Sequence, residues 1–305
     1  MISILNNMSC PGLYCGRTQL SNYELSECGP CPRGFRRNET TYICELCTDE
    51  PFFYDWLYLG FVVLLMLVLH CFFIDMISMR RSFNKDILIL HSVACIEVTV
   101  AAVISLILSH PIGKLTIHSC KVRSIADWYT LLHNPIPNYE KKVYCTQEAV
   151  YPLYTTVFLF YGLCLIFMIL FRPWLCKKYL PRQSKMSIYA ALYFIPILVL
   201  MHALIGGLLY YCFPHLVLVL SVISCAAHFA VKLDQSIKSL IVSTLVEPRN
   251  LVILIGHWCL HAYGLISITQ MLNPSLHASL ILLIPLPALF YILTARFTDP
   301  SKFQF

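Results

Sequence analysis

The chain carries little charge for its length. Only 12% of its 305 residues are Asp, Glu, Lys or Arg, whereas 58% are hydrophobic. This composition leaves too little charged surface for a soluble protein of this size and is typical of a helical bundle that faces lipid. A basic run with interleaved aromatic residues is also lacking, so the net charge of +6 gives no reason to expect a nucleic acid partner.

Two further features are lacking. Met1–Leu5 has neither the basic start nor the long apolar core of a cleavable signal peptide, so we expect the first apolar stretch to insert as its own anchor. The sequence has no phosphate-binding glycine loop, no Ser/His/Asp order and no nucleophile elbow. We therefore expect no enzyme activity, no catalytic residue, no cofactor and no bound metal.

Long apolar stretches make up most of what is present. Each can cross the ~30 Å of bilayer hydrocarbon at about 1.5 Å per helical residue. The sequence thus predicts an all-α polytopic membrane protein with seven transmembrane helices and a small Cys-rich luminal module at its N-terminus. The predicted division is 1–50 for the module, 51–298 for the transmembrane domain and 299–305 for a short cytosolic tail. The predicted spans are 54–77, 87–109, 151–171, 188–207, 208–230, 251–270 and 276–294.

Glycine and proline predict irregularities in these spans. The break Ile205-Gly-Gly207 indicates a tight turn between the fourth and fifth spans. Kinks are expected where proline lies inside a span, at Pro196, Pro214, Pro285 and Pro287.

The basic residues predict the orientation. With the N-terminus outside the cytosol, 13 of the 22 Lys and Arg residues fall in the shorter, cytosolic connections and tail, as the positive-inside rule requires. Arg80 and Arg81 follow the first span, whereas Asp49, Glu50 and Asp55 lie before or at its start. We count Arg172 among the cytosolic loop residues, directly after the third span.

Cysteines are concentrated in the N-terminal module. Two C-x-x-C pairs separated by twelve residues fit either a tetrahedral zinc site or, in an oxidising lumen, disulfides. Asn7 and Asn38 begin two N-glycosylation sequons, which are used only in the lumen and favour disulfides. The disulfide candidates of the module are Cys10, Cys15, Cys28, Cys31, Cys44 and Cys47, with fifteen possible pairings. Cys120 and Cys145, in the long second luminal connection, predict a further disulfide of that loop.

Ionisable residues inside the spans suggest sites, because charge at membrane depth is costly. Glu97 lies near the middle of the second span, and His257 and His261 share a face of the sixth. Glu97 and His261 lie at the same depth, so we expect an interhelical hydrogen bond between them. A catalytic metal held by the histidines is the alternative, although the glutamate of an H-E-x-x-H pattern is missing.

Several strings along the chain carry a family resemblance. Together they resemble the Jun N-terminal kinase-associated membrane protein (JAMP) family over essentially the whole chain. The strings are 12–16 (GLYCG), 27–34 (ECGPCPRG), 54–61 (YDWLYLGF), 127–130 (DWYT), 148–155 (EAVYPLYT), 187–194 (SIYAALYF), 257–258 (HW), 260–264 (LHAYG) and 287–291 (PALFY).

The resemblance implies a seven-span protein of the endoplasmic reticulum with a luminal N-terminus and a cytosolic C-terminus. It implies an adaptor that recruits proteasomes and ubiquitin ligases for disposal of misfolded proteins and modulates Jun N-terminal kinase signalling. Two alternatives stay open. One is a seven-helix ligand-sensing receptor, although the acidic-Arg-aromatic triplet and the Asn-Pro-x-x-Tyr signature of rhodopsin-like receptors are missing. The other is an intramembrane metal-dependent hydrolase based on the histidines.

Overall fold

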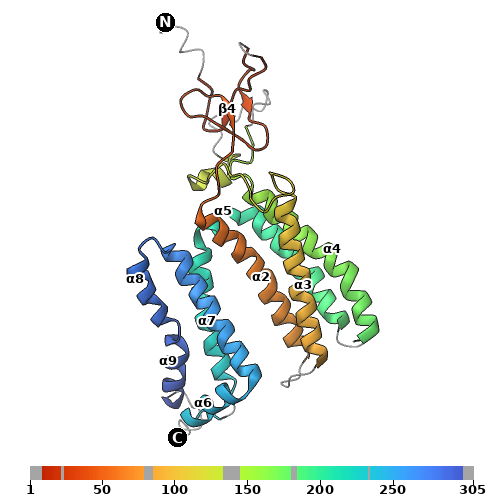
Figure 1. The fold of residues 1–305 in the computed structure, drawn as a ribbon, viewed down its shortest axis with the longest axis vertical. Helices are drawn as coiled ribbons and strands as arrows, with labels where there is room; N and C mark the ends of the chain where they lie inside the picture. The colour runs from red at the N-terminus through yellow and green to blue at the C-terminus, as the bar shows by residue number, and fades with distance from the viewer. Residues whose placement is uncertain are drawn as a thin grey trace. The chain divides into compact units, whose positions relative to one another are not determined.

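The computed structural model describes residues 9–21, 24–78, 85–132, 145–179, 184–232 and 234–297. Within this part the chain forms two compact units, one made mainly of residues up to Tyr210 and the other of residues from Tyr211 onward (Figure 1). The sequon at Asn7, the predicted tail 299–305 and the basic pair Arg80 and Arg81 lie outside the described residues.

Two small antiparallel sheets shape the cysteine-rich head, residues 9–50. Strand β1 (Cys15–Gly16) pairs with β2 (Gly29–Pro30), and β3 (Phe35–Arg37) pairs with β4 (Cys44–Leu46). Such short strands bury little apolar surface, so covalent links must supply much of the head's stability.

Three membrane-length helices form the core of the first unit. They are α2 (Phe53–Ser78), α3 (Lys85–Ile107) and α4 (Leu153–Tyr179), and the 3-10 helix η1 (Ile125–Trp128) lies in the connection between α3 and α4. Each long helix buries one stripe of residues at helical spacing, while its other faces expose apolar side chains suited to lipid. The stripes are 62–66–70–74 on α2, 90–94–97–101–105 on α3 and 157–161–164–168–172 on α4.

Helix α5 (Ser184–Ala230) contains both the fourth and the fifth predicted spans. The expected tight turn between them is absent from this described helix; instead, Ile205 alone has non-helical angles, φ −123° and ψ 24°. The Tyr154 hydroxyl donates to the carbonyls of His202 and Ala203, at 3.2 and 2.8 Å, directly before this kink. The break is therefore a kink with hydrogen-bonded carbonyls and not a loop.

Glycine is required just after the kink. A Cβ on Gly207 would lie 2.7 Å from Trp128 Cβ and 2.8 Å from the Tyr129 ring, and a Cβ on Gly206 would lie 3.2 Å from the Tyr154 ring. The glycine pair thus lets α5 contact the connection that carries η1.

The second unit holds the remaining helices. They are the end of α5, α6 (Ile237–Val246), α7 (Pro248–Thr269), α8 (Pro274–Ser279), the 3-10 helix η2 (Leu280–Leu283), α9 (Leu286–Thr294) and the 3-10 helix η3 (Ala295–Phe297). Buried residues of five elements form its core. They are Cys225 and Phe229 of α5, Leu240 of α6, Leu254 of α7, Ala288 and Ile292 of α9, and Ala295 of η3.

The described residues contain six helical segments long and apolar enough to cross a membrane. The fourth of them, Lys185–Ala230, has 46 residues, about 69 Å of helix, which is twice the hydrocarbon thickness. The helical membrane architecture with a small, disulfide-bonded N-terminal region is therefore confirmed. The last span differs from the prediction because Pro274–Thr294 is divided into α8, η2 and α9.

Candidate functional site

Four disulfides join all eight candidate cysteines of the head and of the connection between α3 and α4. The bonds are Cys10–Cys28, Cys15–Cys145, Cys31–Cys44 and Cys47–Cys120. Two of the four therefore link the head to the connection.

This pairing corrects two expectations. The head does not close three disulfides among its own six cysteines, and Cys120 and Cys145 do not pair with each other. Each C-x-x-C pair is divided between two disulfides, so its thiols do not converge on one metal in the structure. The sequence could not reveal this, because only the fold brings residues 130 and 73 positions apart within bonding distance.

A buried aspartate organises the same junction. Asp127 of η1 accepts hydrogen bonds from the Tyr14 hydroxyl at 3.1 Å, from Arg36 Nη2 at 3.1 and 3.2 Å, and from the backbone N–H of Arg123 at 2.8 Å. Burial beside this carboxylate raises the pKa of the Tyr14 phenol, which keeps the hydroxyl a neutral donor. Sequence reasoning missed Asp127 and Tyr14 as partners, although both lie in strings that carry the family resemblance.

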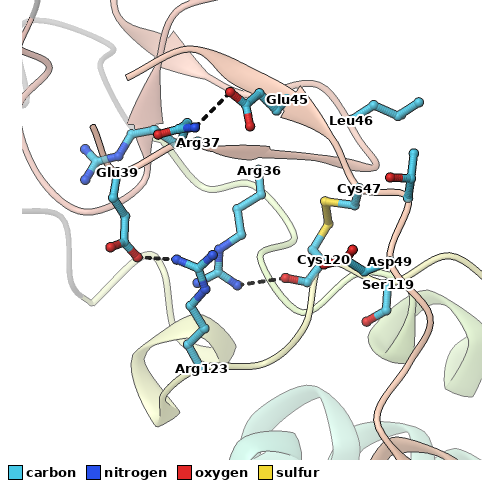
Figure 2. Close-up of a pocket in the computed structure, with 12 residues that line it drawn as sticks. Arg36, Arg37, Glu39, Glu45, Leu46, Cys47, Asp49, Ser119, Cys120 and Arg123 are labelled. Atoms are coloured by element: carbon cyan, nitrogen blue, oxygen red, sulfur yellow. Dashed lines mark hydrogen bonds and ion pairs between the residues drawn. A yellow bond between two sulfur atoms is a disulfide. The ribbon is translucent and has the colours of Figure 1, made fainter. Parts of the chain in front are cut away.

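A polar pocket of about 400 Å³ opens beside this junction. Figure 2 shows that Arg36 and Arg123 converge from the head and from the connection, with the Cys47–Cys120 disulfide at one edge. Arg123 forms an ion pair with Glu39, and Arg36 Nη1 donates to the Cys120 carbonyl at 3.2 Å. The charges of the pocket are thus largely satisfied within the chain.

The sequon residue Asn38 lies at the rim of this pocket. Its side-chain oxygen accepts from the Thr40 hydroxyl at 2.8 Å, and its Nδ2 donates to Glu45 at 2.8 Å. Asn38 is half-buried and follows strand β3 directly, so the sequon lies on a surface turn of the head.

A buried polar cluster lies among the membrane-spanning helices of the first unit. Arg172 of α4 is fully buried, and Glu97 of α3 and His70 of α2 are 4% and 2% exposed. The Arg172 guanidinium forms an ion pair with Glu97, with Nη2 bonded to Oε2 and Nε donating to Oε1 at 3.4 Å. It also lies 3.4 Å from His70 Nδ1. Because arginine has no acceptor, this contact needs a neutral His70 with its proton on Nε2.

The cluster corrects the expectation that Glu97 pairs with His261. The structure gives each residue another partner: Arg172 for Glu97, and Ser221, whose hydroxyl lies 2.9 Å from His261 Nδ1. The sequence led us to end the third span at Phe171 and to count Arg172 as a loop residue. Helix α4 instead continues through Pro173 to Tyr179. The spacing 161–164–168–172 would have placed Arg172 on the buried face of α4.

The histidines of α7 lie in the second unit, opposite the end of α5. His257 Nε2 lies 2.8 Å from the Ser224 hydroxyl, and the His257 ring lies 6.0 Å from that of His228, centre to centre. Within the described residues, no three His, Cys, Asp or Glu side chains are grouped so that they could hold a metal. The arrangement gives α5 and α7 interhelical hydrogen bonds at two levels.

Helix α6 lies in the connection between α5 and α7. Gln235 Nε2 donates to the Phe229 and Lys232 carbonyls at the end of α5, and Asn250 Nδ2 donates to the Ser243 carbonyl of α6 at 3.0 Å. Leu240 is buried on the inner face. The outer face exposes Lys238, Ile241, Val242, Leu245 and Val246. The connection therefore holds a short helix that presents an apolar surface with one cation.

Comparison with known proteins gives a consistent result over nearly the whole chain. The family described as "JNK1/MAPK8-associated membrane protein" matches residues 10–300. The proteins of that name from Mus musculus and Homo sapiens are each 48% identical over 302 residues, which cover 96% of this chain and 95% of theirs. A homologue of that name from Caenorhabditis elegans is 31% identical over 311 residues, covering 96% of this chain and 94% of its own. No solved structure matches the chain.

Proposed function

Since the chain belongs to the family of JNK1/MAPK8-associated membrane proteins, we propose that it is an endoplasmic reticulum membrane adaptor. In this proposal it binds Jun N-terminal kinase and prolongs its signalling, and it recruits ubiquitin ligases and proteasomes for the disposal of misfolded proteins. The observation that carries the proposal is 48% identity to relatives whose name states the kinase association. That name describes an association and not a reaction, which agrees with an adaptor.

The disulfides support a luminal head. Disulfides persist in oxidising compartments such as the lumen of the endoplasmic reticulum. The bonds Cys15–Cys145 and Cys47–Cys120 require the head and the connection between α3 and α4 to share one side of the membrane. That requirement is met if α2 and α3 each cross once. The sequons at Asn7 and Asn38 are then on the luminal side.

The length of α5 supports seven crossings. If α5 crosses twice, with its kink at Ile205 near one surface, the total is seven and the tail lies in the cytosol. The excess of Lys and Arg in the cytosolic connections supports the same orientation, even without the buried Arg172.

The partner contact is proposed to lie on the cytosolic side. Helix α6 is its best-placed described element, because its outer face exposes Val242 and Leu245, while side-chain hydrogen bonds of Gln235 and Asn250 lie on either side of the helix. A cytosolic partner that buries these side chains gains roughly 25 cal/mol per Å² of apolar surface.

Co-precipitation tests the proposal. Full-length protein should retain the kinase, and Leu245→Ser should weaken its retention several-fold, whereas Ser239→Ala on another face of α6 is the matched control. Proximity labelling from a C-terminal tag should mark kinase and proteasome subunits, and labelling from an N-terminal tag should mark luminal proteins. Labelling of cytosolic proteins from the N-terminal tag, or no kinase retention by the full-length protein, would contradict the proposal.

A further inference from the structure

The last membrane span leaves most of its surface uncovered. Only 6% of its most apolar window, within Pro274–Thr294, is buried, whereas 39% is buried for α2 and α4. Its buried residues form a single narrow stripe at Ala288 and Ile292.

This span is also broken at membrane depth. Pro287 has no N–H to donate to the carbonyl of Leu283, four residues earlier, and Pro285 has none for Ile281. The Ile281 carbonyl instead accepts from Ile284 N at 3.1 Å. The two prolines therefore interrupt the regular backbone hydrogen bonding of this span.

A groove of about 380 Å³ lies at this break. Leu283, Leu286, Pro287 and Phe290 of the last span line it together with His261 of α7 and with Val222 and Tyr291. It is therefore an apolar groove that contains one imidazole.

One ring nitrogen of His261 is already engaged inside the protein. Its Nδ1 lies 2.9 Å from the Ser221 hydroxyl, which also lies 2.8 Å from the Leu218 carbonyl. The other ring nitrogen, Nε2, is left for a ligand, and it can hydrogen-bond an amide or hydroxyl side chain in either tautomer of the ring.

We propose that this groove docks a transmembrane helix of another protein, one that carries an Asn, Gln, Ser or Thr side chain at membrane depth. The apolar walls accept its aliphatic side chains, and the His261 imidazole hydrogen-bonds its polar side chain. A lipid acyl chain offers no partner to this imidazole. The inference deepens the adaptor function proposed above, because misfolded membrane proteins expose such polar residues, but its test needs no kinase or proteasome.

A defined probe tests the selection. Purified full-length protein in phosphatidylcholine vesicles is mixed with a fluorescent transmembrane peptide of leucine and alanine that has one central asparagine. The all-apolar peptide is the matched probe. We expect about three-fold tighter binding of the asparagine peptide, since an interhelical hydrogen bond in a membrane is worth ~0.6 kcal/mol. His261→Leu should abolish the preference, whereas His261→Gln should retain it through the amide oxygen. Equal binding of both peptides to the parent protein would overturn the proposal.

Two tryptophan variants separate a loss of peptide binding in the groove from a folding defect. Leu286→Trp fills the groove and should reduce binding of both peptides, whereas Leu289→Trp, exposed on the same helix but outside the groove, should not. Unchanged binding by Leu286→Trp would place the peptide elsewhere and overturn the proposal.

Photo-crosslinking identifies the occupant. A photoreactive residue replaces Phe290, which lines the groove and is 59% exposed, or Leu293, which is 60% exposed and lies outside it. The asparagine peptide should react several-fold more at position 290. Lipid adducts alone at 290, adducts with a second copy, or adducts with the chain's own first unit would each show another occupant and overturn the proposal.

Discussion

Removing the charge of Glu97 should destabilise the protein severely. Glu97 and Arg172 are 4% and 0% exposed and form an ion pair, so Glu97→Gln leaves a buried guanidinium without its counter-charge. Breaking one side of such a buried pair costs about 3–5 kcal/mol. We therefore expect a loss of ~3 kcal/mol, or about a hundred-fold in the ratio of folded to unfolded protein.

The cost of Glu97→Gln depends on which residue pairs with Glu97. If Glu97 were bonded to a histidine, glutamine would replace it well and the change would be mild. Arg172→Leu should cost as much as Glu97→Gln, whereas the double change Glu97→Gln with Arg172→Leu should recover at least half of the loss, because no unpaired charge remains.

Reversible unfolding of the purified protein in mixed detergent micelles measures these effects. Phe171→Leu, next to Arg172 but half-exposed, is the matched control and should change stability by less than ~1 kcal/mol. If the single changes are mild, or if their effects simply add in the double variant, the two side chains do not interact and the reasoning fails.

Three further predictions concern the first unit. Peptide mapping without reduction should recover a Cys15–Cys145 peptide pair, and Cys145→Ser should cost ~2–5 kcal/mol in unfolding; mixed pairings in the native protein would contradict the structure. Gly207→Ala should lower the melting temperature by several degrees, because its Cβ would overlap Trp128. Gly162→Ala is the control, since the space around Gly162 is open, and equal effects of the two changes would refute the close contact. Asp127→Asn should cost about 1–3 kcal/mol by leaving Arg36 with a neutral partner, and unchanged melting would show that the junction is not held by this carboxylate.

The pattern of apolar residues was enough to predict the membrane helices. Helix α2, for example, matches the predicted span 54–77 to within one residue at each end, because a run of about twenty apolar residues has few alternatives to a membrane helix. Glycine and two of the four prolines also indicated the right regions: Gly206 and Gly207 lie just after the kink in α5, and Pro285 and Pro287 lie at the break in the last span. Helix α5 keeps helical angles at Pro196 and Pro214.

Only the tertiary structure shows which cysteines and which buried polar residues pair with one another. The Cys15–Cys145 bond and the contact between Tyr14 and Asp127 join segments more than a hundred residues apart, and nothing local in the sequence specifies such pairs. Arg172 was missed because Arg-Pro suggests a helix end, whereas in the structure α4 stays helical for seven residues beyond Arg172. Composition and periodicity report how each segment is solvated, and so they predict which segments are buried in the membrane. The partner of a buried charge depends on which helix faces meet, and that is set by the packing of the whole bundle.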